Sequence, residues 1–303
     1  MDESKLLKRL ARPEGVTDVV LDTDTYNEVD DQYALSYLIH SGHNVKAIFA
    51  APFLNDKSVS PEDGMEKSYD EIKKLLKLAG KEDIPAYRGS RGYLPDEKTP
   101  VASEVAETLV RLACSDAYAG DRPLYVISIG AITNVASALL MKPEIAERIV
   151  VLWLGGNAFH WPTAKEFNLY QDIAAVRVVF DSGAPVVLFP AMGVVTHLTV
   201  TEPELRHWLA GKNELADYLY GITVADTEPH NRGRAWSRVI WDVSAVAWLV
   251  KEGAAQSYIA HSPVVSYDGM YGFDNTRHFM RYVYMVNRDV VFTDMFEKIT
   301  KGS

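Results

Sequence analysis

Short apolar, β-branched runs alternate along the chain with longer segments of helical period. Five of these runs are too continuously apolar to be half-exposed strands: residues 19–21, 45–49, 125–129, 149–154 and 186–189. Because strands of a parallel sheet are covered on both faces, such runs predict buried strands in a mostly parallel sheet. The alternation itself is typical of βα units. We therefore expect an α/β fold with helices on both faces of the sheet.

Between these runs, apolar side chains recur at spacings of three and four residues, as amphipathic helices require. Two such series are Val29, Tyr33, Tyr37 and Met65, Tyr69, Ile72, Leu76. No long Gly/Ser/Pro linker interrupts the pattern, so we predict one domain over residues 1–303, with residues 1–16 as an N-terminal extension and 299–303 as a frayed tail. Residues 55–64 and 227–234 are polar and irregular. We expect loops there, the second being a candidate mobile lid.

The charge of the chain narrows its choice of partners. Its 303 residues carry 31 Lys and Arg against 41 Asp and Glu, a formal net charge of −10, which disfavours binding to nucleic acid or to anionic membranes.

No signal-peptide pattern opens the sequence, and no apolar run reaches the roughly 18 residues of a membrane span. The single cysteine, Cys114, lies in an apolar helical stretch, where we expect a buried, inert thiol. These features predict a cytoplasmic protein.

An acidic segment follows the first predicted strand. Residues 22–31 contain five carboxylates: Asp22, Asp24, Glu28, Asp30 and Asp31. In open α/β sheets ligands bind beyond the carboxyl ends of the strands, and converging hard oxygens are what Ca²⁺ or Mg²⁺ requires. The segment therefore predicts a divalent metal site. The alternative is that Asp30 caps the following helix while the other acids are solvated.

Two further segments place polar groups after apolar runs. Gly155-Gly156-Asn157 is followed by Glu166 and Asn168, which in an extended segment would face the same side and could hold adjacent sugar hydroxyls. Alternatively, Asn168 caps the next helix. Asp242 precedes an apolar helical run at residues 243–250, where it could equally be an N-cap.

Taken in order, these segments resemble the inosine-uridine-preferring nucleoside hydrolase family. The likeness covers residues 17–298, through LDTDTYNEVDDQYAL at 21–35, GAITNVASALL at 130–140, GGN at 155–157, EFNLYQD at 166–172 and VIWDVSAVAWLV at 239–250. The resemblance implies a single α/β domain on a Rossmann-like core, usually a homodimer or homotetramer. It also implies hydrolysis of the N-glycosidic bond of ribonucleosides, with a tightly held Ca²⁺, to free base and ribose.

The resemblance assigns roles residue by residue. Asp24 would contact the metal and act as general base toward the attacking water. Asp31, Asp242 and the backbone carbonyl of Ile129 would complete the protein's metal ligands. Ribose hydroxyls would be bound by Asp30, Asn55, Glu166 and Asn168. Positive charge builds on the ribosyl ring as its bond to the base breaks, so an acidic cavity suits this chemistry.

The chain departs from the family pattern at three places. The acidic loop, D-x-D-P-G-x-D-D in the family, here has five residues (25–29) between its acid pairs in place of three. Tyr26 and Glu28 are therefore expected to reach the site in ways that the family pattern does not predict. Trp241 stands where the family often has a His linked to leaving-group activation, and His160 where an Asn is usual. Trp241, Trp236, His160 and His230 are candidates for stacking on or protonating the leaving base. Alternatively, the Trp residues are core and the His residues solvated.

Two other functions remain open at this stage. The run VVLDTDTY at residues 19–26 is similar to the nucleophile loop of haloacid-dehalogenase-type phosphohydrolases, although Tyr26 stands at its fifth position and the later Lys and acidic pair are not apparent. A catalytically idle member that binds Ca²⁺ and ribosides is also conceivable because the loop is altered. The presence of Asp24, Asp30, Asp31 and Asp242 favours the active hydrolase.

Overall fold

The centre of the molecule is an eight-stranded sheet. The computed structural model describes residues 1–301, and its strands are ordered β3-β2-β1-β4-β5-β6-β12-β9. Their bounds are β1 Asp18–Thr23, β2 Asn44–Ala50, β3 Ala86–Arg88, β4 Leu124–Ser128, β5 Ile149–Leu154, β6 Val186–Phe189, β9 Ala255–His261 and β12 Phe279–Val286. All neighbours pair in parallel except β9, which is antiparallel to β12. The predicted mostly parallel α/β fold is confirmed.

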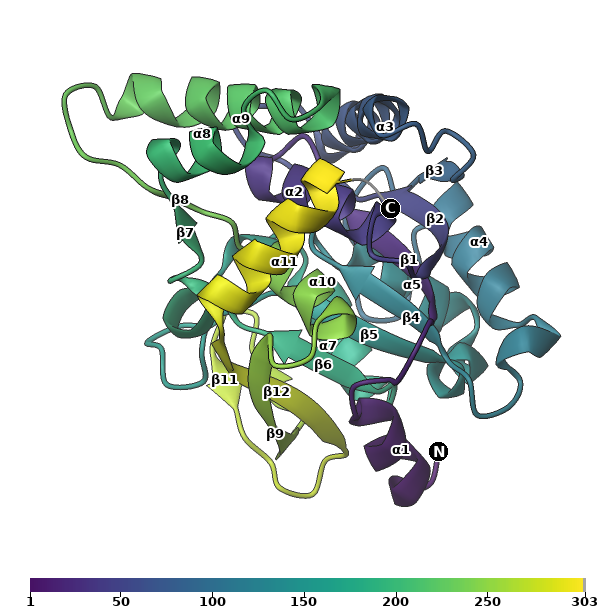
Figure 1. Ribbon diagram of the computed structural model, residues 1–303. Helices are drawn as coiled ribbons and strands as arrows, with labels where there is room; N and C mark the ends of the chain where they lie inside the picture. Colours follow the sequence, from purple (N-terminus) through teal and green to yellow (C-terminus); the bar gives the residue numbers. More distant parts are fainter. Residues whose placement is uncertain (302–303) are drawn as a thin grey trace.

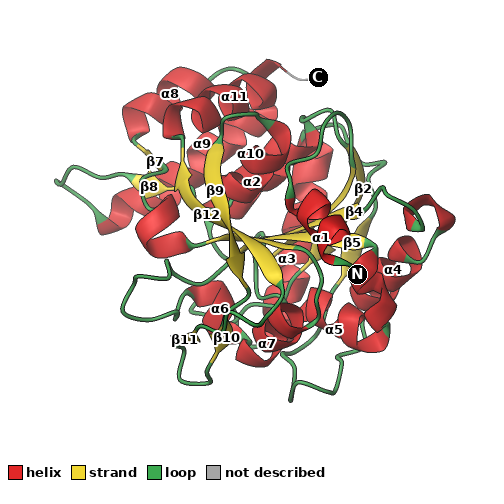
Figure 2. Ribbon diagram, turned by 90° about the horizontal axis from the view of Figure 1, so that it is seen from below, coloured by secondary structure: helices red, strands yellow, loops and turns green. Residues whose placement is uncertain are grey.

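Helices cover both faces of this sheet (Figures 1 and 2). One layer contains α2 (Val29–Ile39), α3 (Pro61–Leu78), α8 (Glu202–Leu209), α9 (Glu214–Thr227), α10 (Val243–Val250) and α11 (Arg288–Lys301). The other contains α4 (Glu104–Ala113), α5 (Thr133–Met141) and α7 (Ile173–Asp181). Along β1, Val19 and Leu21 pack into the first layer and Val20 into the second. Alternate side chains thus join separate cores, which is why these strands are apolar throughout.

Smaller elements complete the chain. Helix α1 (Glu3–Leu10) packs near β12, short helix α6 (Phe167–Gln171) precedes α7, and two antiparallel two-stranded pairs lie outside the main sheet. These pairs are β7 (Thr199–Val200) with β8 (Arg238–Val239), and β10 (Val264–Val265) with β11 (Tyr271–Gly272). Short 3₁₀ turns cover residues 116–118, 143–147 and 228–230, and an irregular helical turn covers 191–195.

The apolar runs located all five strands that they predicted, although β4 ends one residue earlier, at Ser128. Two boundary predictions were wrong. Residues 55–64 are not entirely loop, because Ser60 accepts a hydrogen bond from the Asp63 N–H and α3 begins at Pro61. The expected frayed tail is helical as far as Lys301, with Ile299 buried; residues 302–303 lie outside the described range.

The prediction of a buried thiol at Cys114 was also wrong, because this side chain is exposed. Helix α4 buries Val105, Leu109 and Ala113 on one face. Cys114 follows Ala113 at the C-cap, and one helical residue corresponds to a turn of about 100°, which directs its side chain away from that face.

Among residues 1–301, no helix is long and apolar enough to span a membrane.

Candidate active site

A cavity of about 300 Å³ opens beyond the carboxyl ends of β1, β4 and β5. It is bordered by residues that follow these strands, by the start of α2 and by the start of α10. Nine predicted site residues line it: Asp24, Asp30, Asp31, Asn55, Ile129, Glu166, Asn168, Trp241 and Asp242. The fold thus brings together residues as distant in sequence as Asp24 and Asp242, at the sheet edge where α/β proteins bind ligands.

Four carboxylates are buried against this cavity. Asp24, Asp30, Asp31 and Asp242 are between 0 and 3% exposed. One oxygen from each of Asp30, Asp31 and Asp242 lies within 4.8 Å of the others, whereas Asp24 stands outside this tight group. Asp30 and Asp31 lie in the first turn of α2, where the helix dipole favours negative charge.

These carboxylates strongly perturb one another. Burial is the largest cause that raises the pKa values of Asp24, Asp31 and Asp242 well above the ordinary range, and their mutual repulsion adds to it. For Asp30, burial and the neighbouring Glu28 raise the pKa to about 7, although Arg238 opposes the rise. The cluster therefore carries negative charge at neutral pH only at a high electrostatic cost, which a bound cation would offset.

The donor set fits a hard divalent cation. The side chains that could hold it are all carboxylates. Oδ1 of Asp24 and Oδ1 of Asp30 are buried without a hydrogen-bond partner among the described residues. Buried polar atoms are normally satisfied, so unpartnered carboxylate oxygens aimed at a shared cavity are what a metal site requires. The carbonyl of Ile129 borders the same cavity.

Asn27, which no sequence pattern marked as a site residue, holds the Asp24 side chain by a hydrogen bond. Its amide donates to Asp24 Oδ2 at 3.0 Å, and Asn55 in turn donates to Asn27 Oδ1 at 2.6 Å. A Cβ atom on Gly130 would lie 2.9 Å from Asp24 Oδ1, so a glycine is needed at that position. Asn27 belongs to the lengthened part of the acidic loop, which is the signal that could have identified it.

Asp22, the first acid of the segment, does not reach the cavity. Its carboxylate accepts hydrogen bonds from Ser128 Oγ at 2.9 Å and from Asn134 Nδ2 at 2.8 Å, within the sheet layer. Burial raises the pKa of Asp22 to about 6, while these two hydrogen bonds lower it. Asp22 therefore fixes the base of the acidic loop to α5 rather than contributing directly to the cavity.

Glu166 and Asn168 lie at the cavity, but not in the predicted extended segment. Glu166 N-caps α6 and accepts hydrogen bonds from the backbone N–H groups of Gly156, Asn168 and Leu169 at 2.8–3.1 Å. Burial nevertheless raises its pKa to about 7. The Asn168 amide group donates to the carbonyls of Ile129 and Leu154 at 3.0 and 3.1 Å, which leaves its Oδ1 free to accept.

Side-chain capping does not explain Asp30, Asp242 or Asn168. Helix α2 begins at Val29, so Asp30 lies inside its first turn and Glu28 holds the N-cap position without a side-chain capping bond. Asp242 occupies the N-cap position of α10, again without such a bond. Asn168 does not cap α7; Asp172 accepts from Ala175 N and does so instead.

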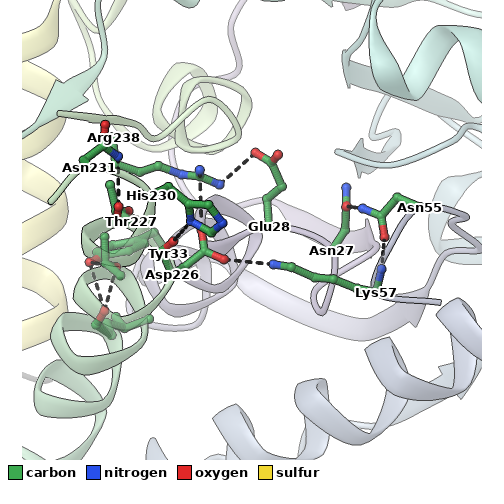
Figure 3. Close-up of polar contacts among 12 residues, drawn as sticks. Asn27, Glu28, Tyr33, Asn55, Lys57, Asp226, Thr227, His230, Asn231 and Arg238 are labelled. Atoms are coloured by element: carbon green, nitrogen blue, oxygen red, sulfur yellow. Dashed lines mark hydrogen bonds and ion pairs between the residues drawn. The ribbon is translucent and has the colours of Figure 1, made fainter. Parts of the chain in front are cut away.

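A chain of ion pairs crosses one rim of the cavity (Figure 3). Lys57 pairs with Asp226 at 3.1 Å, Asp226 with Arg238 at 3.5 Å, and Arg238 with Glu28 at 3.0 Å. Glu28 lines the cavity, whereas the other three residues come from the loop before α3, the end of α9 and β8. The predicted loop at residues 227–234 is therefore anchored on both sides, at Asp226 and at Arg238. Nothing in the sequence indicated a role for Arg238.

The candidates for leaving-group contacts take different positions. Trp241 is half-buried, lines the cavity and donates its backbone N–H to Asp30 at 3.2 Å. His160 and His230 are exposed and do not line the cavity, and neither does half-buried Trp236. The Nε2 atom of His160 nevertheless lies beside Gly193, and the preceding Met192 is a lining residue. His230 accompanies Asp226 on the ion-paired rim.

Comparison with known proteins identifies the class of the site. The model of the inosine-uridine preferring nucleoside hydrolase family matches residues 19–290. A pyrimidine-specific ribonucleoside hydrolase of Salmonella paratyphi A is 26% identical over 229 residues, covering 67% of this chain and 73% of that protein.

Solved structures give the same fold. A purine-preferring ribonucleoside hydrolase from Gardnerella vaginalis superposes with a TM-score of 0.73 at 21% identity, covering 94% of this chain and 98% of that one. An inosine-guanosine nucleoside hydrolase superposes with a TM-score of 0.76 at 17% identity, covering 95% and 99%. Because the family model covers most of the sequence, this chain belongs to the inosine-uridine-preferring nucleoside hydrolase family and hydrolyses the N-glycosidic bond of ribonucleosides.

Proposed function

We propose that the chain uses a bound Ca²⁺ for this hydrolysis, held by Asp24, Asp31, Asp242 and the carbonyl of Ile129. The observation that carries the proposal is the group of four buried carboxylates facing one cavity with no Lys or Arg nitrogen within ion-pairing distance of them among the described residues. Ca²⁺ takes six to eight oxygen ligands, more than these groups supply, which leaves room for water and ribose hydroxyls. The close grouping of Asp30 with Asp31 and Asp242 makes Asp30 a further candidate ligand.

In this proposal Asp24 is the general base. Its unpartnered Oδ1 accepts a proton from the attacking water, while Asn27 keeps Oδ2 fixed. A bound Ca²⁺ would lower the pKa of a coordinated water and so favour its deprotonation. Water adds to C1′ as the bond between C1′ and the base nitrogen breaks, and the buried acids stabilise the positive charge that develops on the ribosyl ring.

The ribose would be oriented by groups with free acceptor capacity. Asn168 Oδ1 and the Glu166 carboxylate face the cavity, and Asp30 and Asn55 border it. Carboxylate and amide oxygens accept hydrogen bonds from sugar hydroxyls, which would fix C1′ near Asp24. We propose these four residues as the ribose-binding set.

The base of the nucleoside would contact the apolar side chains of the cavity. Trp241, Phe167 and Met192 line the cavity and can contact a flat heterocycle. We propose that His160, beside the Met192–Gly193 turn, donates the proton that the departing base nitrogen requires, and that His230 contacts the substrate from the ion-paired rim.

The test is ribose release, followed as reducing sugar, from inosine, adenosine, guanosine, uridine, cytidine and nicotinamide riboside. Activity should disappear after chelation and return with Ca²⁺. Asp24→Asn should abolish turnover, whereas Asp56→Asn, an exposed neighbour on a nearby loop, should leave it unchanged. Activity that persists through chelation, or in Asp24→Asn, would refute the metal and base assignments.

We also propose that the chain forms a homodimer or homotetramer in the cytoplasm. Several large apolar side chains are exposed near β9, β12 and the β10–β11 pair: Tyr258, Tyr267, Met270, Phe273, Tyr284 and Met285. Exposed apolar side chains gathered on neighbouring elements are typical of protein interfaces.

The free, exposed thiol of Cys114 suits a reducing compartment. Sedimentation velocity and cell fractionation test these two statements.

A further inference from the structure

A second cavity, of about 440 Å³, lies at the opposite ends of the strands from the active site. It is lined by α1 and the residues after it, by the start of β1 and by the start of β4. In Figure 1, α1 lies at the bottom of the view and α9 at the top. The six residues of β1 separate the two cavities, a distance of about 20 Å.

Arg9 borders this second cavity with an unbalanced charge. Its side chain is 4% exposed; two of its nitrogens donate to the backbone carbonyls of Glu147 and Gly120, and its Nε has no partner. Among residues 1–301, no carboxylate lies within ion-pairing distance of it. Burying a guanidinium without a counter-charge is costly, so burial lowers the pKa of Arg9 even though Asp121 and Glu147 oppose the effect.

Two more guanidinium groups on the lining are also without ion pairs in the described part of the chain. Arg12 donates to the carbonyl of Trp248 at 3.0 Å, and the exposed Arg122 side chain makes no hydrogen bond with residues 1–301. Two acids of the lining already have cationic partners, Lys8 of the same lining and Lys46 outside it. Asp121 pairs with Lys8 at 3.2 Å, and Asp18 pairs with Lys46 at 3.5 Å and accepts from Tyr118 at 2.9 Å.

Glu14 is the one acid of the described lining that has no ion pair. The three guanidinium groups without an ion pair, those of Arg9, Arg12 and Arg122, therefore outnumber the unpaired carboxylates of this cavity. This excess of positive charge occurs in a chain whose formal net charge is −10. The planar N–H fork of arginine matches phosphate oxygens, and phosphate is most strongly held where several such groups converge. The volume is in the range of small-molecule sites.

We propose that this cavity is a binding site for a small phosphate monoester, separate from the nucleoside site, with Arg9, Arg12 and Arg122 as its phosphate ligands. Arg9 belongs to α1, Arg12 follows that helix, and Arg122 lies two residues before β4. A bound phosphate therefore ties the N-terminal segment to the sheet. The proposal does not depend on the metal or on the base assigned above.

The experiment is calorimetric titration of the full chain with ribose 5-phosphate and with inorganic phosphate, at constant ionic strength and with chelator present to remove metal from the active site. Ribose serves as the probe that lacks the phosphate. We expect saturable binding of one ribose 5-phosphate per chain, with no equivalent binding of ribose. Hydrogen exchange at α1 should slow when the phosphate compound is bound.

Variants locate the binding. Arg122→Gln should weaken ribose 5-phosphate binding about tenfold, the effect of losing one charge-assisted hydrogen bond. Arg111→Gln, on the exposed face of α4, is the matched control and should bind normally. Asp24→Asn should also bind normally, because its change lies in the other cavity. Nucleoside hydrolysis by Arg122→Gln should be unchanged.

Three results would overturn the proposal. One is the absence of saturable binding of either phosphate compound at millimolar concentration. The second is unchanged affinity in both Arg122→Gln and Arg12→Gln; Arg122 is exposed, so its replacement should not impair folding. The third is loss of binding in Asp24→Asn, which would place the ligand in the nucleoside site. A failure of nucleoside hydrolysis would leave all these readouts intact.

Discussion

A guanidinium nitrogen of Arg238 lies 3.0 Å from the carboxylate of Glu28, although 210 residues separate them in the chain. Glu28 belongs to the lengthened acidic loop and Arg238 to β8, directly after the segment that crosses the rim of the active-site cavity. The pair, continued through Asp226 to Lys57, connects three separate segments around one opening (Figure 3). The ion pair between Arg238 and Glu28 thus holds the lengthened acidic loop against β8.

Replacing Arg238 by Gln should therefore raise KM for nucleosides several-fold with a smaller effect on kcat. The change leaves Glu28 without its ion-pair partner beside Asp30 and frees the rim segment, whereas Asp24 keeps its contacts. Steady-state kinetics and faster hydrogen exchange at residues 227–238 are the readouts. Arg234→Gln, an exposed substitution on the same segment, is the control. Equal effects from both variants would contradict a specific role for the Arg238–Glu28 pair.

Asn27→Ala should lower kcat by at least about tenfold. It removes the hydrogen bond that fixes Asp24 Oδ2, and a misplaced general base loses much of its effect. Asn55→Ala should lower kcat less, because Asn55 contacts Asp24 only through Asn27, and should also raise KM, because it removes a proposed ribose contact. Tyr26→Ala, an exposed change on the same loop, should be neutral. If Asn55→Ala lowered kcat more than Asn27→Ala, the direct contact between Asn27 and Asp24 would not be the important one.

His160→Ala should slow the release of bases that leave as poor anions and should spare p-nitrophenyl riboside, whose leaving group needs no proton. The expectation follows from the place of His160 beside the Met192–Gly193 turn. His207→Ala, on α8, is the matched control. An equal loss with both kinds of substrate would show that His160 supports structure rather than protonating the base.

The stability of the metal-free protein should fall as pH rises from about 4 to about 7. Burial raises the pKa of Asp22 to about 6 and those of Asp30 and Glu166 to about 7, against ordinary values of 3.8 and 4.5. In this window the folded state holds protons that the unfolded chain has released, so increasing pH favours unfolding.

Added Ca²⁺ favours the ionised carboxylates, so its stabilising effect should be larger at pH 8 than at pH 5. Thermal unfolding with chelator and with Ca²⁺, at both pH values, measures this difference. Asp242→Asn should reduce the gain from Ca²⁺ at pH 8. A gain that is the same at both pH values would contradict the assignment of the acidic cluster as the metal site.

Several features could be read from the sequence because they depend on short segments. Buried parallel strands need continuous apolar side chains, so the runs located β1, β2, β4, β5 and β6. The acids at Asp24, Asp30 and Asp31 follow the first strand directly, and a strand's carboxyl end is where α/β sheets bind ligands. Asp242 and Asn168 could be connected to them only through the family resemblance, since nothing local relates positions so far apart.

The tertiary structure decided what depends on distant contacts. Strand β9 lacks a clear apolar run, and β12 includes Arg281 among its apolar residues and has exposed positions. The orientation of Glu166 as the cap of α6, the attachment of Asn27 to Asp24 and the pairing of Arg238 with Glu28 follow from where the backbone places side chains that are remote in sequence. The same holds for Arg9, whose charge is buried because α1 packs against the sheet. Local pattern specifies which elements form, whereas the partners of a polar side chain are determined only once those elements pack.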